Sequence, residues 1–450
     1  MMDAQKNWTA VARKAMDTAL HEGASAVRVS LNVSLLDLVG VLNGEIDKLK
    51  HALDCSLQLC LFVDGRYGTF STNCLDETSM EAFIRSAVAM VRMLEKDPCR
   101  RLPEPGRTMK DAISGTEAGL WDPSWNEADT SFLREAALKS ALWRNKEQYE
   151  KGFRLISEEG ELSVNVSENI VVDSNGLFAC HKETSFEAAF EVTIESPDGD
   201  HFEEYWWDSS PFREGFFEKA GKISEEAVRR AGSLLEPKAV PGGVYTMVLD
   251  RECASKLFSP ILNALSGSSI QQKNSFLLDK IGEKLFPSEL TVLDEPRTFG
   301  ATGAKFFDSE GVAANTLPII ENGVLKNYFI STYISEKTGL KPNIESWTRP
   351  VLKPFGGCRT REDLIAKCGE GILVTGFNGG NFNSATGDFS YGVEGFAFHN
   401  GEITHPVREM LITGNLLSLW ASLSATADDA RLCNSKLIPT LAFLNVSFSA

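Results

Sequence analysis

Candidate nucleophiles, bases and metal ligands are scattered along the 450-residue sequence and form no familiar catalytic motif. No two of the six histidines lie four residues apart, the spacing that places two zinc ligands on one helical face. None of the nine cysteines forms a Cys-x-x-Cys pair, and neither a Gly-x-Ser-x-Gly elbow nor a Walker loop occurs. The motifs alone therefore predict no zinc, redox, nucleotide or serine-hydrolase site.

Three isolated residues could still take part in chemistry. His399 and His405 flank a predicted turn, but a metal site built on them needs carboxylates from elsewhere, which favours surface histidines. Cys433 could be a nucleophile or a ligand, yet no paired base is evident in the sequence, which favours an inert thiol. The cysteines as a set are typical of a reduced, cytoplasmic protein.

A glycine-rich run over 376–390 is a further candidate for ligand binding. Glycine lets the backbone approach a ligand closely and adopt positive φ, so this run could receive an extended peptide. The alternative is a connector between two strands of a sheet. The candidate peptide-binding residues are Gly379, Gly380, Gly387, Asp388 and Ser390.

The first hundred residues predict an antiparallel meander between two helices. Apolar stripes predict helices over 4–22 and about 77–94. Asn43-Gly44 and Asp64-Gly65 are strong hairpin signals, because both central residues of a type I′ turn need positive φ. The expected strands are 26–33, 35–42, 45–53, 56–63 and 66–72. Segment 97–125, which contains four prolines, is expected to be a linker or an irregular crossover.

The middle of the chain holds most of the net charge. Residues 151–250 carry 20 acidic and 9 basic side chains, so −11 of the formal −17 lies there. Within 186–195 apolar residues alternate with Glu187, Glu191 and Glu195, a period of two that predicts a strand with one acidic face. That face is interpreted as a solvated surface, or alternatively as a negatively charged surface that attracts cationic or unfolded peptides.

The remaining elements complete an α+β fold. Further helices are expected at about 129–150, 214–234, 251–265 and 411–423, and a strand at 244–249. The chain is expected to divide into an N-terminal antiparallel meander with flanking helices, an acidic middle α+β region, and a Gly-rich, mainly β C-terminal domain with a few helices. The expected boundaries of these three domains are 1–103, 104–236 and 237–450.

Composition excludes several classes of protein. A hydrophobic content of 43% and a charged content of 24% are typical of a soluble globular chain. The formal charge of −17 and the lack of a strongly basic segment argue against direct binding of nucleic acid. No uninterrupted apolar stretch of about 18 residues predicts a membrane span. A cytoplasmic protein without nucleic-acid or membrane partners is expected.

Eight segments, in order along nearly the whole chain, carry a resemblance that is specific when they are taken together. They are Gly40–Glu45, Leu61–Asn73, Ser275–Glu283, Leu290–Pro296, Phe307–Val312, Glu321–Leu325, Thr386–Ser390 and Gly401–Ile403. These segments resemble the TldD/PmbA family, whose members are often labelled modulators of DNA gyrase. The resemblance implies a cytoplasmic peptidase system in which two related subunits form a heterodimer.

The resemblance also implies where a zinc site would lie. The TldD-type subunit carries a His-Glu-x-x-x-His motif on the helix after the strand expected at 244–249, with a cysteine near the C-terminus as third ligand. Here Phe258, Ser259 and Asn263 stand at the motif positions, and Cys433 stands at the third. Phe donates no lone pair to zinc, and Ser is no general base at neutral pH. The chain therefore resembles the PmbA (TldE) type that lacks the metal, and Pro260 is compatible with the first turn of the helix.

The leading hypothesis is a metal-free subunit of a TldD/TldE-type metallopeptidase complex that acts on unfolded peptides or peptide precursors. The subunit would not be catalytic on its own and would bind no cofactor, because zinc is expected only in a TldD-type partner. Exposed β edges and the 376–390 run are candidates for pairing with an extended peptide. One alternative is a non-enzymatic regulatory or binding protein, possibly a homodimer, that acts on gyrase or toxin–antitoxin pathways. Another is a stand-alone hydrolase that pairs Cys433 with a histidine.

Overall fold

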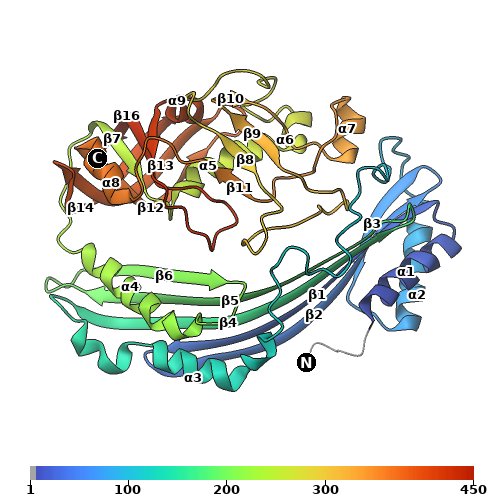
Figure 1. The fold of residues 1–450 in the computed structure, drawn as a ribbon, viewed down its shortest axis with the longest axis horizontal. Coiled ribbons are helices and arrows are strands. Elements are labelled where there is room, and N and C mark those ends of the chain that lie inside the picture. The colour runs from blue at the N-terminus through green and yellow to red at the C-terminus, as the bar shows by residue number, and fades with distance from the viewer. Residues whose placement is uncertain (1–6, 450) are drawn as a thin grey trace. The chain divides into compact units, whose positions relative to one another are not determined.

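A six-stranded antiparallel sheet organises the first part of the chain, drawn from blue to green in Figure 1. The computed structural model describes residues 7–449, which divide into two compact units, 7–233 with 298–314 and 234–297 with 315–449. The sheet of the first unit has the order β3-β2-β1-β4-β5-β6. Its strands are β1 (Ala26–Leu42), β2 (Glu45–Val63), β3 (Arg66–Thr72), β4 (Arg154–Asp173), β5 (Phe178–Glu195) and β6 (His201–Ser210).

Helices cover one face of this sheet because its apolar side chains alternate with polar ones. The α-helices are α1 (Trp8–His21), α2 (Glu77–Val91), α3 (Thr130–Ser140) and α4 (Ala220–Ser233), and 3₁₀ turns lie at Trp125–Glu127, Trp143–Gln148 and Phe217–Lys219. Val27, Val29 and Leu31 of β1 are fully buried with Ala12 and Ala15 of α1 in one core cluster. A period of two on the strand thus meets an apolar stripe on the helix.

The predicted acidic face of the sheet is confirmed. On β5, Phe186, Phe190 and Val192 are buried, whereas Glu187 and Glu191 between them are exposed. Burial and then the neighbouring carboxylates of Glu203 and Glu159 raise the pKa of Glu191. Like charges therefore repel one another across neighbouring strands of this face.

Segment 97–125 forms an irregular but ordered connection. Its backbone carbonyls at Ala112, Gly115 and Leu120 accept hydrogen bonds from the N–H groups of Cys180, Lys182 and Thr184.

Thus the segment runs beside the part of β5 that β6 does not reach, since β6 pairs with β5 only from residue 186 onward. The prolines of the segment explain why it forms no regular strand.

A second six-stranded sheet dominates the other unit, with the order β14-β13-β12-β7-β16-β15. An additional pairing of β14 with β16 closes five of the strands into a ring. The strands are β7 (Gly243–Leu249), β12 (Gly371–Phe382), β13 (Asp388–His399), β14 (Glu402–Asn415), β15 (Leu423–Thr426) and β16 (Leu441–Ser449). All the pairings are antiparallel except β12 with β7, which is parallel.

Smaller elements complete this unit. A four-stranded sheet, β10-β9-β8-β11, consists of β8 (Val292–Asp294), β9 (Leu317–Glu321), β10 (Val324–Leu325) and β11 (Pro350–Leu352). The helices are α5 (Ala254–Ala264), α6 (Gly267–Gln271), α7 (Thr332–Thr338), α8 (Arg361–Cys368) and α9 (Leu416–Ala421).

Several predicted boundaries are wrong. The expected breaks near Ser34 and Asp54 do not occur, because the antiparallel pairing of β1 with β2 continues without a shift through both residues, which lie opposite each other. The helix expected at 129–150 ends at Ser140, and a 3₁₀ turn follows.

Residues 411–415, expected to be helical, belong to β14 and pair with β13, so the last helix starts only at Leu416. Short apolar runs do not distinguish a helix from a strand until long-range pairing is known. The start of the helix expected at 4–22 lies partly outside the described residues.

The α+β fold class is confirmed, with more strand than helix in the described chain. Both predicted hairpin turns are also confirmed: φ is +49° and +74° at Asn43 and Gly44, and +50° and +76° at Asp64 and Gly65. The division into three domains stays a prediction. Among residues 7–449, no helix is long and apolar enough to cross a membrane.

Asp294 is a buried carboxyl group at the end of β8, with only 1% of its surface exposed. The backbone N–H groups of Thr348 and Arg349 donate hydrogen bonds to it at 3.0 and 2.5 Å. Burial outweighs these hydrogen bonds and raises the pKa of Asp294 to about 6.

This raised pKa predicts a pH-dependent stability. Because the pKa of about 6 lies above the ordinary 3.8, the folded chain binds this proton more tightly than the unfolded chain. The resulting stabilisation is complete below about pH 4 and is lost as pH rises through about 6. Relative to Asp294→Asn, the wild type should lose on the order of 3 kcal/mol of unfolding free energy over that range. Urea titrations of both proteins at several pH values measure this difference, and parallel pH curves would contradict it.

Candidate functional site

A polar cavity of about 400 Å³ lies against helix α5, the helix that carries the three degenerate zinc-motif positions. Its lining residues are Glu252, Cys253, Ser255, Lys256, Ser259, Pro260, Asn263 and Tyr391. Ser255, Ser259 and Asn263 follow one another at intervals of four residues. They therefore form a polar stripe on one side of a helix whose other side is apolar. We call this cavity the α5 pocket.

The opposite side of α5 is anchored in the core. Phe258 is fully buried, and its ring centroid lies 5.4 Å from that of Trp420 on α9. The indole Nε1–H of Trp420 donates a hydrogen bond to the carbonyl of Leu257 at 3.1 Å. Trp420 packs in turn on Phe443 of β16, with centroids 5.5 Å apart. This aromatic cluster fixes the orientation of α5 about its helix axis. It therefore determines which residues of the helix face the pocket.

A side-chain hydrogen bond joins Ser259 of α5 to Lys436 in the segment before β16. The ammonium group of Lys436 donates to the hydroxyl oxygen of Ser259 at 2.8 Å. Lys436 also lies 5.1 Å from the ring centroid of Trp347. Burial lowers the pKa of Lys436, because the charged form loses its hydration.

The mouth of the pocket offers groups that are free to bind a ligand. The side-chain amide of Asn263 is exposed and has no hydrogen-bond partner within residues 7–449. Burial raises the pKa of Tyr391, and the ammonium group of Lys256 lies 5.4 Å from its ring centroid. Pro260 has no N–H to donate to the carbonyl of Lys256, which therefore lacks its usual helical partner. Pro260 lies inside α5, so its expected place in the first turn is wrong.

The inner wall of the pocket is a network of charges. Arg431 donates to Glu252 Oε2 at 2.9 Å, while Glu252 Oε1 is buried without a hydrogen bond in the described chain. The thiol of Cys253 lies 3.4 Å from the carbonyl oxygens of Asp250 and Val374, to which it donates. The hydrogen-bonded thiol and the ion pair make this wall a structural support rather than a source of a nucleophile.

The glycine-rich run forms the β12–β13 hairpin. Gly379 and Gly380 lie at an irregularity in the pairing with β13 and are exposed, with φ of +128° and +129°. A Cβ at Gly380 would lie 2.2 Å from the carbonyl oxygen of Ser390, so only glycine fits there. Gly387 (φ +83°) ends the turn and is buried.

Asp388 supports the same hairpin. Its carboxylate accepts hydrogen bonds from the Thr386 hydroxyl at 2.6 Å and from the Asn415 amide at 2.9 Å, and both lower the pKa of Asp388. None of the five predicted peptide-binding residues lines the α5 pocket, although Tyr391, directly after Ser390, does. The connector interpretation of the run thus describes its local role.

The hairpin nevertheless leaves a sheet edge near the pocket. β12 pairs with β7 only over Ile372–Val374, and within the described residues no strand pairs with 375–382 on that side. The edge begins directly after Val374, whose carbonyl oxygen accepts a hydrogen bond from the thiol of the pocket residue Cys253. Gly380, near the other end of the edge, lies opposite the pocket residue Tyr391. Residues 375–382 are called the β12 edge below.

The residues at the zinc-motif positions do not fit a zinc ion. Phe258 faces the aromatic core, and the hydroxyl of Ser259 is hydrogen-bonded to Lys436. Of the three residues, only Asn263 has a side-chain oxygen without a hydrogen bond in the described chain. Zinc sites in proteins use Cys, His, Asp and Glu ligands. Across the described chain, no group of three or more such side chains could hold a metal ion.

The two C-terminal histidines, His399 and His405, interact with groups other than the Cys433 thiol. His399 Nδ1 lies 3.3 Å from a carboxylate oxygen of Glu370, and His405 Nδ1 lies 3.1 Å from the hydroxyl of Thr404. Cys433 is half-buried and is not part of a disulfide bond. Its pairing with a histidine as a hydrolase site stays a prediction, which loss of all activity in Cys433→Ala would support.

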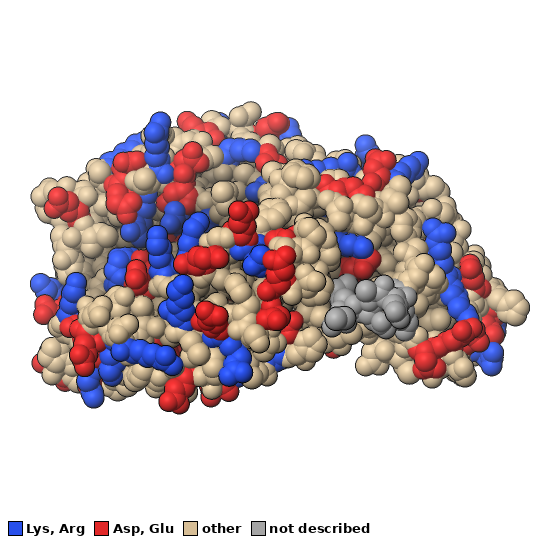
Figure 2. All heavy atoms as spheres, turned by 60° about the horizontal axis from the view of Figure 1, so that its bottom comes forward, with Lys and Arg blue, Asp and Glu red and all other residues tan. Residues whose placement is uncertain are grey.

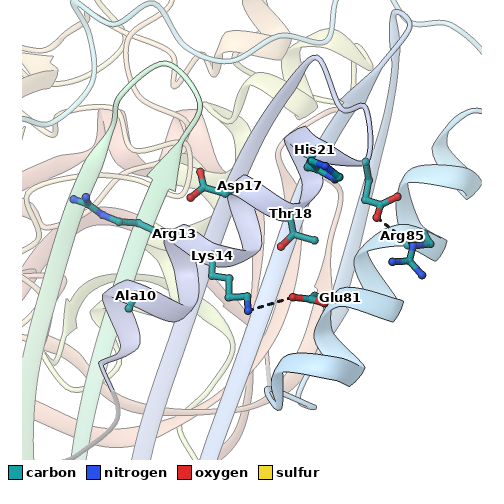
Figure 3. A pocket seen from close by; sticks show the side chains of 9 residues that line it. Ala10, Arg13, Lys14, Asp17, Thr18, His21, Glu81 and Arg85 are labelled. Carbon is teal, nitrogen blue, oxygen red and sulfur yellow. Dashed lines mark hydrogen bonds and ion pairs between the residues drawn. The ribbon is translucent and has the colours of Figure 1, made fainter.

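A second cavity, of about 760 Å³, lies between α1 and α2 in the first unit (Figure 3). Ion pairs join its two walls: Lys14 contacts Glu77 and Glu81, and Arg85 contacts Glu22. Charges that neutralise one another across a groove leave little for a charged ligand to bind. The face of the molecule in Figure 2 likewise shows Lys and Arg interspersed with Asp and Glu.

Sequence reasoning missed most of the α5 pocket. The four-residue spacing of Ser255, Ser259 and Asn263 was a usable signal, because it predicts one polar helix face. Lys436 follows Ser259 by 177 residues and carries no local signal.

Family models match most of the chain. Residues 242–450 match the PmbA/TldA metallopeptidase C-terminal domain, and residues 126–235 match the central domain of the same proteins. Metalloprotease PmbA of Escherichia coli O157:H7 is 25% identical, over 88% of this chain and 87% of that protein. The PmbA homologue of Haemophilus influenzae is 26% identical, over 92% of this chain and 90% of its own.

Solved structures resemble the whole chain. A crystal structure of a candidate modulator of DNA gyrase from Bacteroides thetaiotaomicron has a TM-score of 0.92 and 38% identity, covering 100% of both chains. TldE from Thermococcus kodakarensis has a TM-score of 0.83 at 20% identity, covering 98% of this chain and 100% of its own, and shows a shared fold.

Proposed function

Because the chain belongs to the PmbA/TldD family of metallopeptidases, we propose that it is a metal-free, TldE/PmbA-type subunit of a cytoplasmic peptidase complex. The proposal rests on the orientation of α5 about its helix axis. This orientation places Phe258 in the aromatic core and turns Ser259 and Asn263 toward the pocket, so the helix cannot present a zinc ligand set. Zinc chemistry then belongs to a TldD-type partner with the intact motif.

The ligand of this subunit is an unfolded peptide in extended conformation. The β12 edge offers main-chain donors and acceptors that a peptide strand can pair with, which gives affinity without sequence preference. The α5 pocket beside it supplies the Asn263 amide, the Tyr391 hydroxyl and the Lys256 carbonyl for polar groups of the same peptide. Strand addition on the edge and polar contacts in the pocket would orient the chain for cleavage by the partner.

A substitution that fills the pocket tests this proposal. Asn263 is exposed, so Asn263→Trp should fold normally while its indole occupies the space that the peptide needs. We expect the dissociation constant of a fluorescent unfolded peptide, measured by anisotropy, to rise at least about tenfold, which corresponds to about 1.4 kcal/mol.

The matched control is Ser268→Trp, which adds the same indole at an exposed position of α6 outside the pocket. This variant should bind the peptide as the wild type does. Equal affinity of all three proteins would show that the peptide binds elsewhere.

A second candidate function is non-enzymatic regulation, and the description of the 38% identical relative as a candidate gyrase modulator favours it. In that case the chain would act as a homodimer without a zinc-bearing partner. Binding to topoisomerase subunits, measured with the purified chain alone, separates this function from peptide binding. Tight, salt-dependent binding to DNA itself is not expected, since no segment is strongly basic.

A further inference from the structure

We propose that Ser259 and Lys436 form a serine–lysine dyad, which gives this chain a metal-independent acyl-transfer activity at the α5 pocket. The proposal goes beyond the role of a peptide-binding subunit and does not depend on it. It also changes the interpretation of Ser259: this residue is a poor replacement for a glutamate base, but a hydroxyl can act as a nucleophile.

The geometry is that of a nucleophile with its base. Ser259 Oγ and Lys436 Nζ are 2.8 Å apart, within the range of about 2.6–3.2 Å expected for such a pair. Ser259 lines the cavity, so a ligand there can reach this residue. Lys436 is not part of the lining and contacts Ser259 from outside the cavity. The ring of Trp347, 5.1 Å from the ammonium nitrogen, gives the lysine a fixed neighbour.

The surroundings of Lys436 favour its use as a base. Within the described chain Lys436 forms no ion pair with a carboxylate; it interacts with the hydroxyl of Ser259 and the ring of Trp347. The charged groups of the pocket have other contacts: Glu252 pairs with Arg431, and Lys256 lies over Tyr391. Burial therefore lowers the pKa of Lys436, and no paired carboxylate within the described chain raises it again. The face of the Trp347 ring favours the charged form and opposes part of this lowering.

A donor for the developing charge lies one helical turn away. Asn263 follows Ser259 by four residues on the same side of α5, and its amide is free in the described structure. An amide N–H of this kind can stabilise the oxyanion that forms when a carbonyl is attacked.

The reaction assigned to the dyad is transfer of an acyl group from an ester or amide to Ser259 and then to water. The neutral amine of Lys436 accepts the hydroxyl proton while Ser259 Oγ forms a bond to the carbonyl carbon. The tetrahedral oxyanion, facing Asn263, then collapses and breaks the bond to the leaving group, which takes the proton from the Lys436 ammonium. Water then attacks the acyl-serine carbonyl and gives one proton to the neutral amine of Lys436. As the bond between the carbonyl carbon and Ser259 Oγ breaks, Lys436 returns that proton to Ser259 Oγ, and the carboxylic acid is released.

A fluorophosphonate probe tests the dyad without knowledge of the substrate. Incubation of the purified full chain with this probe, in the presence of a chelator, is expected to add one adduct that peptide mapping places on Ser259. The labelling rate should rise with pH to a plateau whose midpoint lies below the ordinary pKa of lysine. Ser259→Ala should abolish the adduct. Lys436→Met and Lys436→Arg should each slow labelling at least about 100-fold, because neither side chain can accept the proton.

The controls separate catalysis from packing. Lys436→Arg keeps a donor for the Ser259 hydroxyl, so it tests the base apart from the hydrogen bond. Ser268→Ala removes an exposed hydroxyl outside the pocket and should label as the wild type does. Thermal melts establish that each variant is folded. Failure of the folded wild type to label at Ser259, or labelling of Lys436→Arg at the wild-type rate, would overturn the proposal.

Discussion

Writing the zinc motif back into α5, by Phe258→His, Ser259→Glu and Asn263→His together, is expected to destabilise the protein rather than create a zinc peptidase. Phe258 is fully buried against Trp420, and removal of a buried Phe ring costs about 3–5 kcal/mol. Histidine adds a polar ring whose nitrogens find no partner in this aromatic core. Urea denaturation should therefore show a loss of about 3–5 kcal/mol, and zinc should neither bind tightly nor restore stability.

The matched control for this variant is the double substitution Ser259→Glu with Asn263→His. Both positions face the pocket, so the double variant should keep most of the wild-type stability. The difference between the triple and double variants isolates the burial of residue 258. A triple variant with wild-type stability, tight zinc binding and chelator-sensitive peptidase activity would refute the account of α5.

Combining this chain with a TldD-type paralogue that carries the intact His-Glu-x-x-x-His is expected to produce a large gain in peptide turnover. Zinc bound in that partner would activate a water molecule for attack on the peptide bond, and such activation contributes many orders of magnitude in rate. We expect hydrolysis of an unfolded peptide to rise at least about 1,000-fold over this chain alone, and to be lost on addition of a chelator.

Two controls show what each subunit contributes to this gain. A partner whose first motif histidine is replaced by alanine should give no turnover with this chain. The Asn263→Trp variant of this chain should lower turnover in the complex by weakening peptide binding. A partner that is equally active alone would show that this chain plays no part in the reaction.

The local chemistry of turns and alternation was predictable from the sequence. Asn43-Gly44 and Asp64-Gly65 adopt positive φ because a two-residue hairpin requires it there, whatever the rest of the fold does. The alternation at 186–195 likewise predicted one buried and one acidic face, since a strand has only two faces.

Features set by long-range packing were not predictable. β14 pairs with β16, but nothing in the sequence of either segment indicates that the two strands are neighbours. That Phe258 faces the core while Ser259 faces a pocket depends on Trp420 and Phe443, which lie far along the chain. The hydrogen bond between Ser259 and Lys436 arises in the same way, so the sequence identified the position of the altered motif but not its new chemical partner.

The most direct test of the central claim is the zinc content and chelator-sensitive peptidase activity of this chain purified alone. The chain should be incubated with an unfolded peptide, with added zinc and with a chelator, and metal content should be measured on the same sample. The account predicts no stoichiometric zinc and no hydrolysis that a chelator removes, because α5 presents Phe258, Ser259 and Asn263 in place of ligands. One bound zinc per chain together with hydrolysis abolished by the chelator would contradict it.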